Sequence, residues 1–164
     1  MKKISIIFSF RNEEKNLKEL LVRTNKVLKN VKSKYSSELI FVNDLSTDNS
    51  LNILKENLDY YPIKIINMSR RFGSTSCVLA GFKNATGDLV IYLDSDLQDP
   101  PELIEALLAK YEEGYDVVHT LRTKRLGEPK SKLFFTNMAY TIIDKLSDID
   151  LEKNVGDFKL ISRR

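Results

Sequence analysis

The sequence contains one cysteine, Cys77, and one histidine, His119, among its 164 residues. A single cysteine excludes a disulfide within the chain and fits a reducing, cytosolic setting. Cys77 stands in an apolar stretch, which favours a small core residue over a reactive thiol. Zinc sites need a cluster of cysteine and histidine ligands, and these two residues do not make one. The sequence therefore predicts neither a disulfide scaffold nor a zinc protein.

Long hydrophobic runs and a strong net charge are also lacking. No apolar run approaches the roughly 18 residues of a membrane-spanning helix, and the net charge of +3 is too small to indicate a nucleic-acid partner. Residues 1–14 begin with basic residues and a short apolar run but have no small-residue cleavage site, which favours a first strand over a signal peptide. The length, with 42% hydrophobic and 30% charged residues, predicts one globular domain.

Two glycine-rich nucleotide motifs are missing. No two glycines lie two positions apart, so the dinucleotide-binding pattern GxGxxG is absent. Gly81 and Gly87 have neither the spacing nor the lysine of the phosphate-binding pattern GxxxxGK[ST]. These absences argue against a dehydrogenase and against a P-loop nucleotide hydrolase.

Strand and helix patterns alternate along the chain. The expected strands cover residues 3–10, 38–43, 63–68, 88–94, 115–122 and 157–162. The expected helices run from Asn12 to Val31, over 46–58, over 74–85, from Asp99 to Gly114 and over 133–146. The strands are nearly continuous in apolar residues, as in strands buried on both faces. The pattern therefore predicts an α/β fold with a mostly parallel sheet and helices on both faces.

Capping residues set the expected helix ends. Asn12 and Asp99 are expected N-caps, and Pro100 suits the first helical position after Asp99. Gly87 and Gly114 are expected to end helices, because glycine readily adopts the left-handed conformation found there.

Polar residues follow each expected strand. In an open parallel sheet, ligands bind beyond the carboxyl ends of the strands, so these residues are expected to share one edge and form a site. They are Ser9, Phe10, Arg11, Asn12 and Glu13 after the first strand, Asn43 and Asp44 after the second, Ser69, Arg70 and Arg71 after the third, Asp94, Ser95 and Asp96 after the fourth, and Arg122 after the fifth.

The segment after the fourth strand is rich in side-chain oxygens. Asp94, Asp96 and Gln98 are spaced by two, and in an extended segment such residues share a face. Three oxygen-bearing side chains suit a hard cation, Mg2+ or Mn2+, which would also relieve the repulsion between the carboxylates. The alternative is that Asp96 and Asp99 are only turn and cap residues, and Asp99 is interpreted in that way.

Basic residues are expected at the same edge. A cation held by few protein ligands usually bridges to substrate phosphates, and arginines bind phosphate oxygens in a bidentate manner. Arg70, Arg71, Arg122 and Arg125 would together suit a diphosphate. The alternative for each is a solvated surface arginine, and residues 69–73 could simply begin a helix.

Four segments together resemble family 2 glycosyltransferases of the GT-A fold. They are FSFRNEEKNL, ELIFVNDLSTDNS, MSRRFGSTSCVLAGFKNATGDLVIYLDSDLQDPPELI and GYDVVHTLR followed by GDFKLISRR. Within the family they resemble the polyprenyl-phosphate branch, which includes dolichol-phosphate mannose synthase-like and bactoprenol glucosyltransferase-like enzymes. The resemblance implies a metal-dependent, inverting transfer of a sugar from a nucleotide-sugar, expected to be a UDP-sugar, to a polyprenyl phosphate in cell-envelope glycan synthesis.

The resemblance also implies roles for individual residues. The implied base and ribose pocket consists of Ser9, Phe10, Arg11 and Glu13, with Asp44, Ser69, Arg70 and Ser95 as further substrate contacts. Asp94 would face the ribose or the metal, while Asp96 and Gln98 would hold Mg2+ or Mn2+ on the diphosphate. Arg122 and the basic loop from Arg125 to Lys132 would close over the phosphates. Asp157 would lie near the acceptor.

The implied catalytic residues are Asp96, Arg122 and Asp157. Asp96, through its metal, and Arg122 would stabilise the leaving diphosphate. Asp157 would position a phosphate acceptor, or would act as general base if the acceptor were a hydroxyl. Arg163 and Arg164 would meet a lipid phosphate or the membrane surface, or would simply form an exposed charged end.

The sequence departs from the family pattern at three positions. Ser9 and Arg11 stand where the family usually has proline and tyrosine, and Leu45 stands where it usually has glycine. Leucine takes a positive φ only with difficulty, so the loop at Leu45 is expected to differ in shape.

The chain stops directly after an expected strand, which predicts a longer native protein. Family members continue into amphipathic and transmembrane helices, so the resemblance implies a membrane contact through a C-terminal part and a location at the inner, cytoplasmic face of the cell membrane. No nucleic-acid partner is expected, and a homo-oligomer is left open. Two other functions remain: a nucleotidyltransferase, and a non-catalytic module that binds a nucleotide-sugar.

Overall fold

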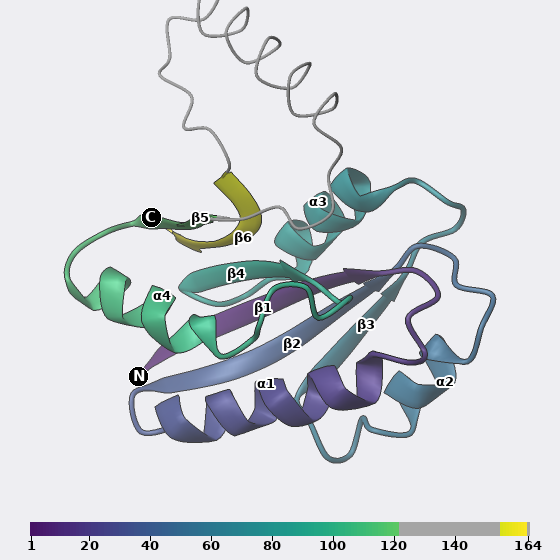
Figure 1. The fold of residues 1–164 in the computed structure, drawn as a ribbon, viewed down its shortest axis with the longest axis horizontal. Coiled ribbons are helices and arrows are strands. Elements are labelled where there is room, and N and C mark those ends of the chain that lie inside the picture. The colour runs from purple at the N-terminus through teal and green to yellow at the C-terminus, as the bar shows by residue number, and fades with distance from the viewer. Residues whose placement is uncertain (122–154, 164) are drawn as a thin grey trace, which may run out of the picture. The chain divides into compact units, whose positions relative to one another are not determined.

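The computed structural model describes residues 1–121 and 155–163 (Figure 1). The elements of this part are, in chain order, β1 (Lys2–Phe10), α1 (Leu17–Val31), β2 (Tyr35–Asn43), α2 (Ser50–Lys55), β3 (Ile63–Asn67), α3 (Ser74–Asn84), β4 (Leu89–Asp94), α4 (Leu103–Glu112), β5 (Val117–Leu121) and β6 (Val155–Ser162). The predicted helix over 133–146 and the basic loop 123–132 lie outside the described residues. None of the described helices is both long and apolar enough to cross a membrane.

The chain divides into two compact units. The first consists of Met1–His119 together with Asp157–Arg164, and it contains all four described helices and the greater part of the sheet. The second, Thr120–Gly156, contains only the ends of β5 and β6 among the described residues. The expectation of one domain was made for the whole chain and stays a prediction.

The six described strands form one sheet in the order β3-β2-β1-β4-β6-β5. β1 pairs in parallel with β2 and β4, and β2 pairs in parallel with β3, so four strands end at the same edge. β6 runs antiparallel to β4, with Tyr92 opposite Lys159. The prediction of a mostly parallel sheet is confirmed.

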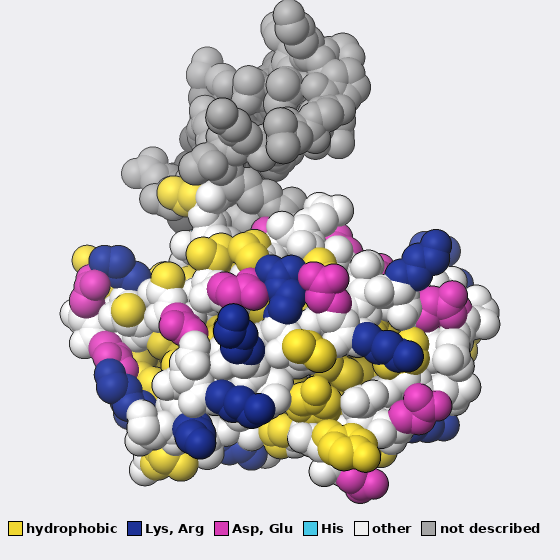
Figure 2. Space-filling view, turned by 60° about the horizontal axis from the view of Figure 1, so that its bottom comes forward, with side chains coloured by type: hydrophobic (Ala, Val, Ile, Leu, Met, Phe, Trp, Pro, Cys, Tyr) yellow, Lys and Arg dark blue, Asp and Glu magenta, His cyan; other side chains and the backbone are white. Residues whose placement is uncertain are grey.

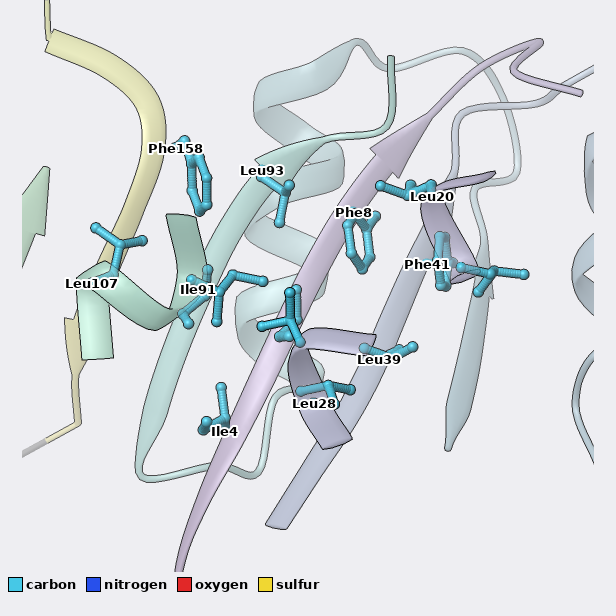
Figure 3. Packing of buried hydrophobic residues seen from close by; sticks show 14 of the residues in the cluster. Ile4, Phe8, Leu20, Leu28, Leu39, Phe41, Ile91, Leu93, Leu107 and Phe158 are labelled. Atoms are coloured by element: carbon cyan, nitrogen blue, oxygen red, sulfur yellow. The ribbon is translucent and has the colours of Figure 1, made fainter. Parts of the chain in front are cut away.

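Alternate residues of the central strands fill two separate apolar layers. Ile4, Ile6 and Phe8 of β1 face α1, α2 and α4, where Phe8 stacks on Phe41 of β2 with ring centroids 4.6 Å apart (Figure 3). Ile7 faces α3, in a smaller cluster with Cys77, which is fully buried as predicted. Helices therefore cover both faces of the sheet, as the apolar strands required.

Two helices begin later than their expected caps. Asn12 has a φ of 58°, and its side-chain Oδ1 accepts a hydrogen bond from the Thr47 N–H at 2.8 Å, while α1 begins only at Leu17. Asp99 is likewise not the cap of α4, which has Glu102 at that position. Both predictions were wrong, and for Asn12 the reason is a side-chain contact with a distant segment, which a cap pattern does not reveal.

The two glycines expected to end helices have different roles. Gly114 follows α4 with a φ of 107° and donates its N–H to the Tyr111 carbonyl at 2.9 Å, as predicted for a left-handed helix end. Gly87 does not cap α3, whose cap is Ala85. Instead Gly87 lies against β1, where an added Cβ would stand 2.7 Å from the Ser5 nitrogen. Position 87 therefore requires glycine, because the backbone there lies close to the backbone of β1.

The outer face of α1 carries charged side chains of both signs, as the space-filling view illustrates (Figure 2). Arg23 bridges Glu19 of its own helix at 3.2 Å and Glu102 beside α4 at 2.7 Å. Lys34 pairs with Glu112 at 2.8 Å. Water and salt screen such exposed pairs, so the contact between α1 and α4 depends mainly on its apolar side.

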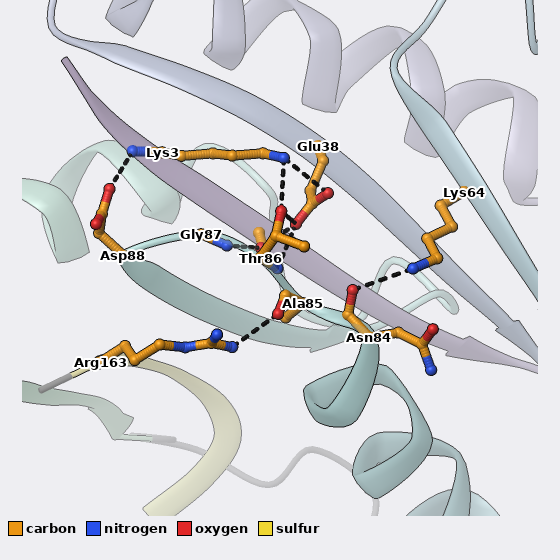
Figure 4. A network of polar contacts seen from close by, with 10 residues as sticks. Lys3, Glu38, Lys64, Asn84, Ala85, Thr86, Gly87, Asp88 and Arg163 are labelled. Carbon is orange, nitrogen blue, oxygen red and sulfur yellow. Dashed lines mark hydrogen bonds and ion pairs between the residues drawn. The ribbon is translucent and has the colours of Figure 1, made fainter.

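A polar network joins β1, β2 and the connection before β4 at the amino edge of the sheet (Figure 4). Glu38 accepts hydrogen bonds from the Ser5 hydroxyl, the Thr86 hydroxyl and N–H, and the Lys3 ammonium. Burial raises the pKa of Glu38, but these hydrogen bonds outweigh burial and lower its pKa to about 2. The charged form of Glu38 is thus strongly favoured in the folded state.

Glu38 is expected to make stability depend on pH. Its folded pKa is depressed, so its contribution is complete above the unfolded value near 4.5 and is lost as pH falls towards 2. After allowance for screening at half-exposed Lys3, that contribution is on the order of 2 kcal/mol. Urea unfolding between pH 7 and pH 3 should show a smaller loss of stability in Glu38→Gln than in the wild type. Glu56→Gln, at an exposed site, is the matched control, and equal slopes for all three proteins would contradict the assignment.

Candidate active site

A cavity of about 270 Å³ lies at the carboxyl edge of the parallel strands. It is formed by the ends of β1, β2 and β4 and by the start of α3. Its lining residues are Ser9, Phe10, Arg11, Glu13, Asp44, Ser74, Asp94, Ser95 and Asp96. The structure thus brings together eight of the residues predicted for the site, and their roles as ligand contacts stay predictions.

Seven predicted site residues are not part of this cavity lining. Arg122, Arg125 and Lys132 lie outside the described residues. Ser69 and Arg70 are exposed, and the Arg70 guanidinium lies 4.7 Å from the centre of the Phe72 ring. Gln98 and Asp157 are exposed and do not line the cavity.

The chain turns directly after Asp94 instead of remaining extended. Leu97 has a φ of 62°, and the Gln98 N–H donates to Asp96 Oδ1 at 3.0 Å. The prediction that Asp94, Asp96 and Gln98 share one face of an extended segment was therefore wrong. The turn retains Asp94 and Asp96 in the cavity and directs Gln98 to the solvent, because spacing by two places residues on one face only while a strand continues.

Asp44 fixes the backbone that leads into α3. Its carboxylate accepts hydrogen bonds from the N–H groups of Phe72 at 2.7 Å and Gly73 at 3.0 Å. Burial first, and Asp44 second, raise the pKa of the Cys77 thiol to about 11. Asp44 therefore holds the backbone of the cavity wall in place and also lines the cavity itself.

Arg11 stabilises the loop that follows β2. Its Nη1 donates to the carbonyl oxygens of Asp44 at 2.9 Å and Leu45 at 3.0 Å. Leu45 has a φ of 56°, so it adopts the left-handed conformation that leucine takes only with difficulty. That this loop differs in shape from the family pattern stays a prediction. The conformation costs roughly 1–2 kcal/mol, and the two hydrogen bonds from Arg11 help to hold it.

Asp94 lies among hydroxyl groups on the α3 side of the sheet. The Tyr92 hydroxyl donates to Asp94 Oδ1 at 2.6 Å, and the Ser9 hydroxyl donates to the same oxygen at 3.4 Å. Ser9 is also the β1 residue opposite Asp94 in the sheet register. Sequence reasoning identified Ser9 but missed Tyr92 and Ser74, although Tyr92 precedes Asp94 by two in a strand and so had to share its face.

Two further carboxylates lie near Asp94. Continuing the β4–β6 register by two residues beyond the pair Tyr92 and Lys159 brings Asp157 opposite Asp94. Burial raises the pKa of Asp94, the Tyr92 hydrogen bond lowers it, and the charges of Asp96 and Asp157 raise it further, with a net rise. The site therefore collects negative charge, and a cation or a proton would stabilise it.

The donor set fits a cation that is shared with a ligand. Within residues 1–121 and 155–163, no group of three or more histidine, cysteine, aspartate or glutamate side chains is arranged to hold a metal ion. Mg2+ in particular is commonly bound through one or two carboxylates and substrate phosphates. Asp94 and Asp96 could supply those carboxylates, so the residues fit a metal that a diphosphate helps to hold.

A larger hollow of about 470 Å³ lies at the opposite edge of the sheet, and its lining includes Lys34, Tyr35 and Tyr111. Its charged groups are already matched, since Lys34 and Tyr35 both bind Glu112, at 2.8 and 3.0 Å. Size does not decide between the two cavities. The smaller one lies where parallel strands end, and its Asp94 and Asp96 form no ion pair with any residue that the structure describes, which favours it as the active site.

Comparison with protein families adds a decisive observation. The model of glycosyl transferase family 2 matches residues 5–164, almost the whole chain. The chain belongs to this family. The cavity residues at the ends of β1, β2 and β4 all lie within the matched region.

Two curated relatives illustrate the match within the family. A glycosyltransferase of Synechocystis sp. is 43% identical over 98% of this chain and 50% of its own length. The undecaprenyl-phosphate 4-deoxy-4-formamido-L-arabinose transferase of Proteus mirabilis is 40% identical over 98% of this chain and 48% of its own length. The chain thus spans about half the length of the curated relatives it matches.

Solved structures agree with the fold. S. aureus TarS 1–349 in complex with UDP-GlcNAc aligns with a TM-score of 0.60 and 27% identity, covering 79% of this chain and 37% of TarS. The same TarS protein in complex with UDP aligns with a TM-score of 0.59. The family 2 chain therefore has the GT-A arrangement of a mixed, mostly parallel sheet between helices.

Proposed function

We propose that this family 2 chain is the donor-binding part of a metal-dependent, inverting glycosyltransferase that uses a nucleotide-sugar. The position of Asp94 and Asp96 in a cavity beyond the parallel strands, with the charge of Asp157 acting on Asp94, carries this proposal. A divalent cation that accompanies a nucleoside diphosphate would supply positive charge to these carboxylates, which form no ion pair with any residue that the structure describes.

A UDP-sugar is the proposed donor and a polyprenyl phosphate the proposed acceptor. The TarS structures with UDP and with UDP-GlcNAc, at 27% identity, support a uridine nucleotide. The name of the Proteus mirabilis relative, at 40% identity, supports undecaprenyl phosphate as the acceptor. With such an acceptor, the native protein would work at the inner face of the cell membrane in envelope glycan synthesis.

Asp94 and Asp96 are the proposed holders of Mg2+ or Mn2+ on the donor diphosphate. When bound, the cation would stabilise negative charge on the departing nucleoside diphosphate. Arg122, outside the described residues, is proposed to assist from the basic loop. Asp44 and Arg11 would hold the cavity wall against the nucleoside while the carboxylates orient the diphosphate.

Asp157 is proposed to position the acceptor rather than to remove a proton from it. A phosphate monoester has a second pKa of about 6 and is largely ionised at neutral pH, so it needs no general base. Because Asp157 extends from β6 beside Asp94, it lies where an acceptor could approach the donor sugar. A hydroxyl acceptor would require a base, and Asp157 would then be the first candidate.

Calorimetry with UDP, UDP-glucose, UDP-N-acetylglucosamine and GDP-mannose tests the donor site. Each nucleotide is titrated with Mn2+ present and again with chelator. Metal-dependent binding of the uridine nucleotides is the expected result. Absence of binding by all four nucleotides would contradict the proposal.

A measurement of turnover distinguishes a glycosyltransferase from a non-catalytic module and from a nucleotidyltransferase. Incubation of the bound donor with undecaprenyl phosphate should give a glycosyl lipid and free UDP. Binding without transfer, even in the full-length protein, would favour a non-catalytic module. Release of pyrophosphate from a nucleoside triphosphate would favour a nucleotidyltransferase.

A further inference from the structure

The hydroxyl of Tyr92 lies beneath the cavity without lining it. Tyr92 is buried, with only 3% of its surface exposed. Its hydroxyl lies 2.6 Å from Asp94 Oδ1, 3.1 Å from the Ser9 hydroxyl and 3.2 Å from the Ser74 hydroxyl. One phenol thus links the ends of β1 and β4 to the start of α3.

The contact occupies one oxygen of Asp94 and not the other. Oδ1 accepts from Tyr92 and from Ser9, whereas Oδ2 accepts no hydrogen bond from any residue that the structure describes. A hydrogen bond to a carboxylate at 2.6 Å is short and charge-assisted, and it restricts rotation of the carboxylate. The orientation of Asp94 therefore depends on a residue that does not line the cavity.

The remaining contacts of Tyr92 fix its own hydroxyl. Ser74 is the first residue of α3, and the Asp44 carboxylate holds the two N–H groups just before it. Ser95, with 2% exposure, donates its hydroxyl to the Ser9 carbonyl at 2.8 Å and so joins β1 to the turn after Asp94. The hydroxyl that orients Asp94 is thus held from two other elements, β1 through Ser9 and α3 through Ser74, as a precise ligand site requires.

We propose that Tyr92 is a positioning residue for the donor site: it fixes Asp94 through Oδ1 so that Oδ2 alone is presented to the ligand. This inference rests on the proposed function and adds to it a residue outside the cavity lining. Oδ2 would either coordinate the divalent cation or accept a hydrogen bond from a ribose hydroxyl of the nucleotide.

Tyr92→Phe tests the proposal because it removes only the hydroxyl. UDP binding in the presence of Mn2+ should weaken about tenfold, the loss expected for one charge-assisted hydrogen bond that orders a ligand group. Mn2+ affinity with UDP present is measured separately, from the loss of the electron paramagnetic resonance signal of free Mn2+. If Oδ2 meets the cation, Mn2+ affinity at saturating UDP falls; if it meets the ribose, UDP affinity falls while Mn2+ affinity at saturating UDP stays unchanged.

Tyr35→Phe is the matched control. Tyr35 is also a buried tyrosine bound to a carboxylate, donating to Glu112 at 3.0 Å at the other edge of the sheet. Thermal unfolding should show similar small losses in both variants, while only Tyr92→Phe weakens ligand binding. If Tyr92→Phe does not fold, Tyr92→Met lacks the same hydroxyl in a similar volume and should show the same loss.

The outcomes separate this inference from the proposed function. If Tyr92→Phe binds UDP with wild-type affinity, or if Tyr35→Phe loses as much UDP affinity, the proposed role of Tyr92 is wrong. Neither result would contradict the proposed donor site. Absence of UDP binding in the wild-type protein would overturn both.

Discussion

Asp96→Asn is expected to weaken Mn2+-dependent UDP binding by about 100-fold. The substitution removes a negative charge from a cavity in which Asp94 is the other carboxylate proposed to hold the cation. Its size and its Oδ1 acceptor are retained, so the hydrogen bond from the Gln98 N–H that closes the turn should persist. The fold should therefore be unaffected, and calorimetry with and without chelator measures the loss directly.

A remote aspartate supplies the control for this experiment. Asp59 is exposed in the connection between α2 and β3, and Asp59→Asn removes the same charge from the protein. Its UDP affinity should equal that of the wild type at every Mn2+ concentration. Full affinity in Asp96→Asn would show that the acidic turn after β4 does not hold the cation.

Gly87→Ala is expected to lower the free energy of unfolding by about 3 kcal/mol. A Cβ at this position would stand 2.7 Å from the Ser5 nitrogen, 2.8 Å from the Lys3 carbonyl oxygen and 2.8 Å from the Ser5 hydroxyl. Two of these atoms belong to the backbone of β1 and cannot move without disturbing the sheet. The Gly87 N–H also donates to the Ser5 hydroxyl, which in turn binds Glu38, so the displacement would reach the polar network.

Urea unfolding of a second glycine variant separates steric from conformational effects. Gly114 has a φ of 107° and no atom within 4 Å of an added Cβ, so Gly114→Ala meets only the conformational cost, about 1 kcal/mol. Gly87→Ala should be clearly the less stable of the two. Equal losses would mean that crowding against β1 is relieved by small shifts.

Element order and sheet type could be predicted from the sequence because they depend on local patterns. The apolar strands and the helical periodicity of segments such as α3 each show within a few residues. The starts of α1 and α4 could not be predicted in this way. The Asn12 side chain binds Thr47, 35 positions away, and no local pattern contains that contact.

Some residues of the candidate site could likewise be predicted from the sequence, and others could not. Residues that end parallel strands, such as Ser9, Asp44 and Asp94, could be assigned to one edge from strand order alone. Gln98 was misassigned because the turn at Leu97 ends the alternation on which the assignment depended. Tyr92 was overlooked because a tyrosine in an apolar strand looks like core until the serines around its hydroxyl are known.

By itself, the sequence determined the family of this chain through its resemblance to known members. It also determined the α/β architecture and the edge at which the carboxylates gather, since both follow from the order of strands and helices. Only the tertiary structure decided what each carboxylate does. Asp44 binds backbone amides, Asp94 is oriented by Tyr92, and Asp157 comes beside it through an antiparallel strand. The reason is physical: the function of a charged group depends on which partners neutralise it, and those partners come from segments far apart in the chain.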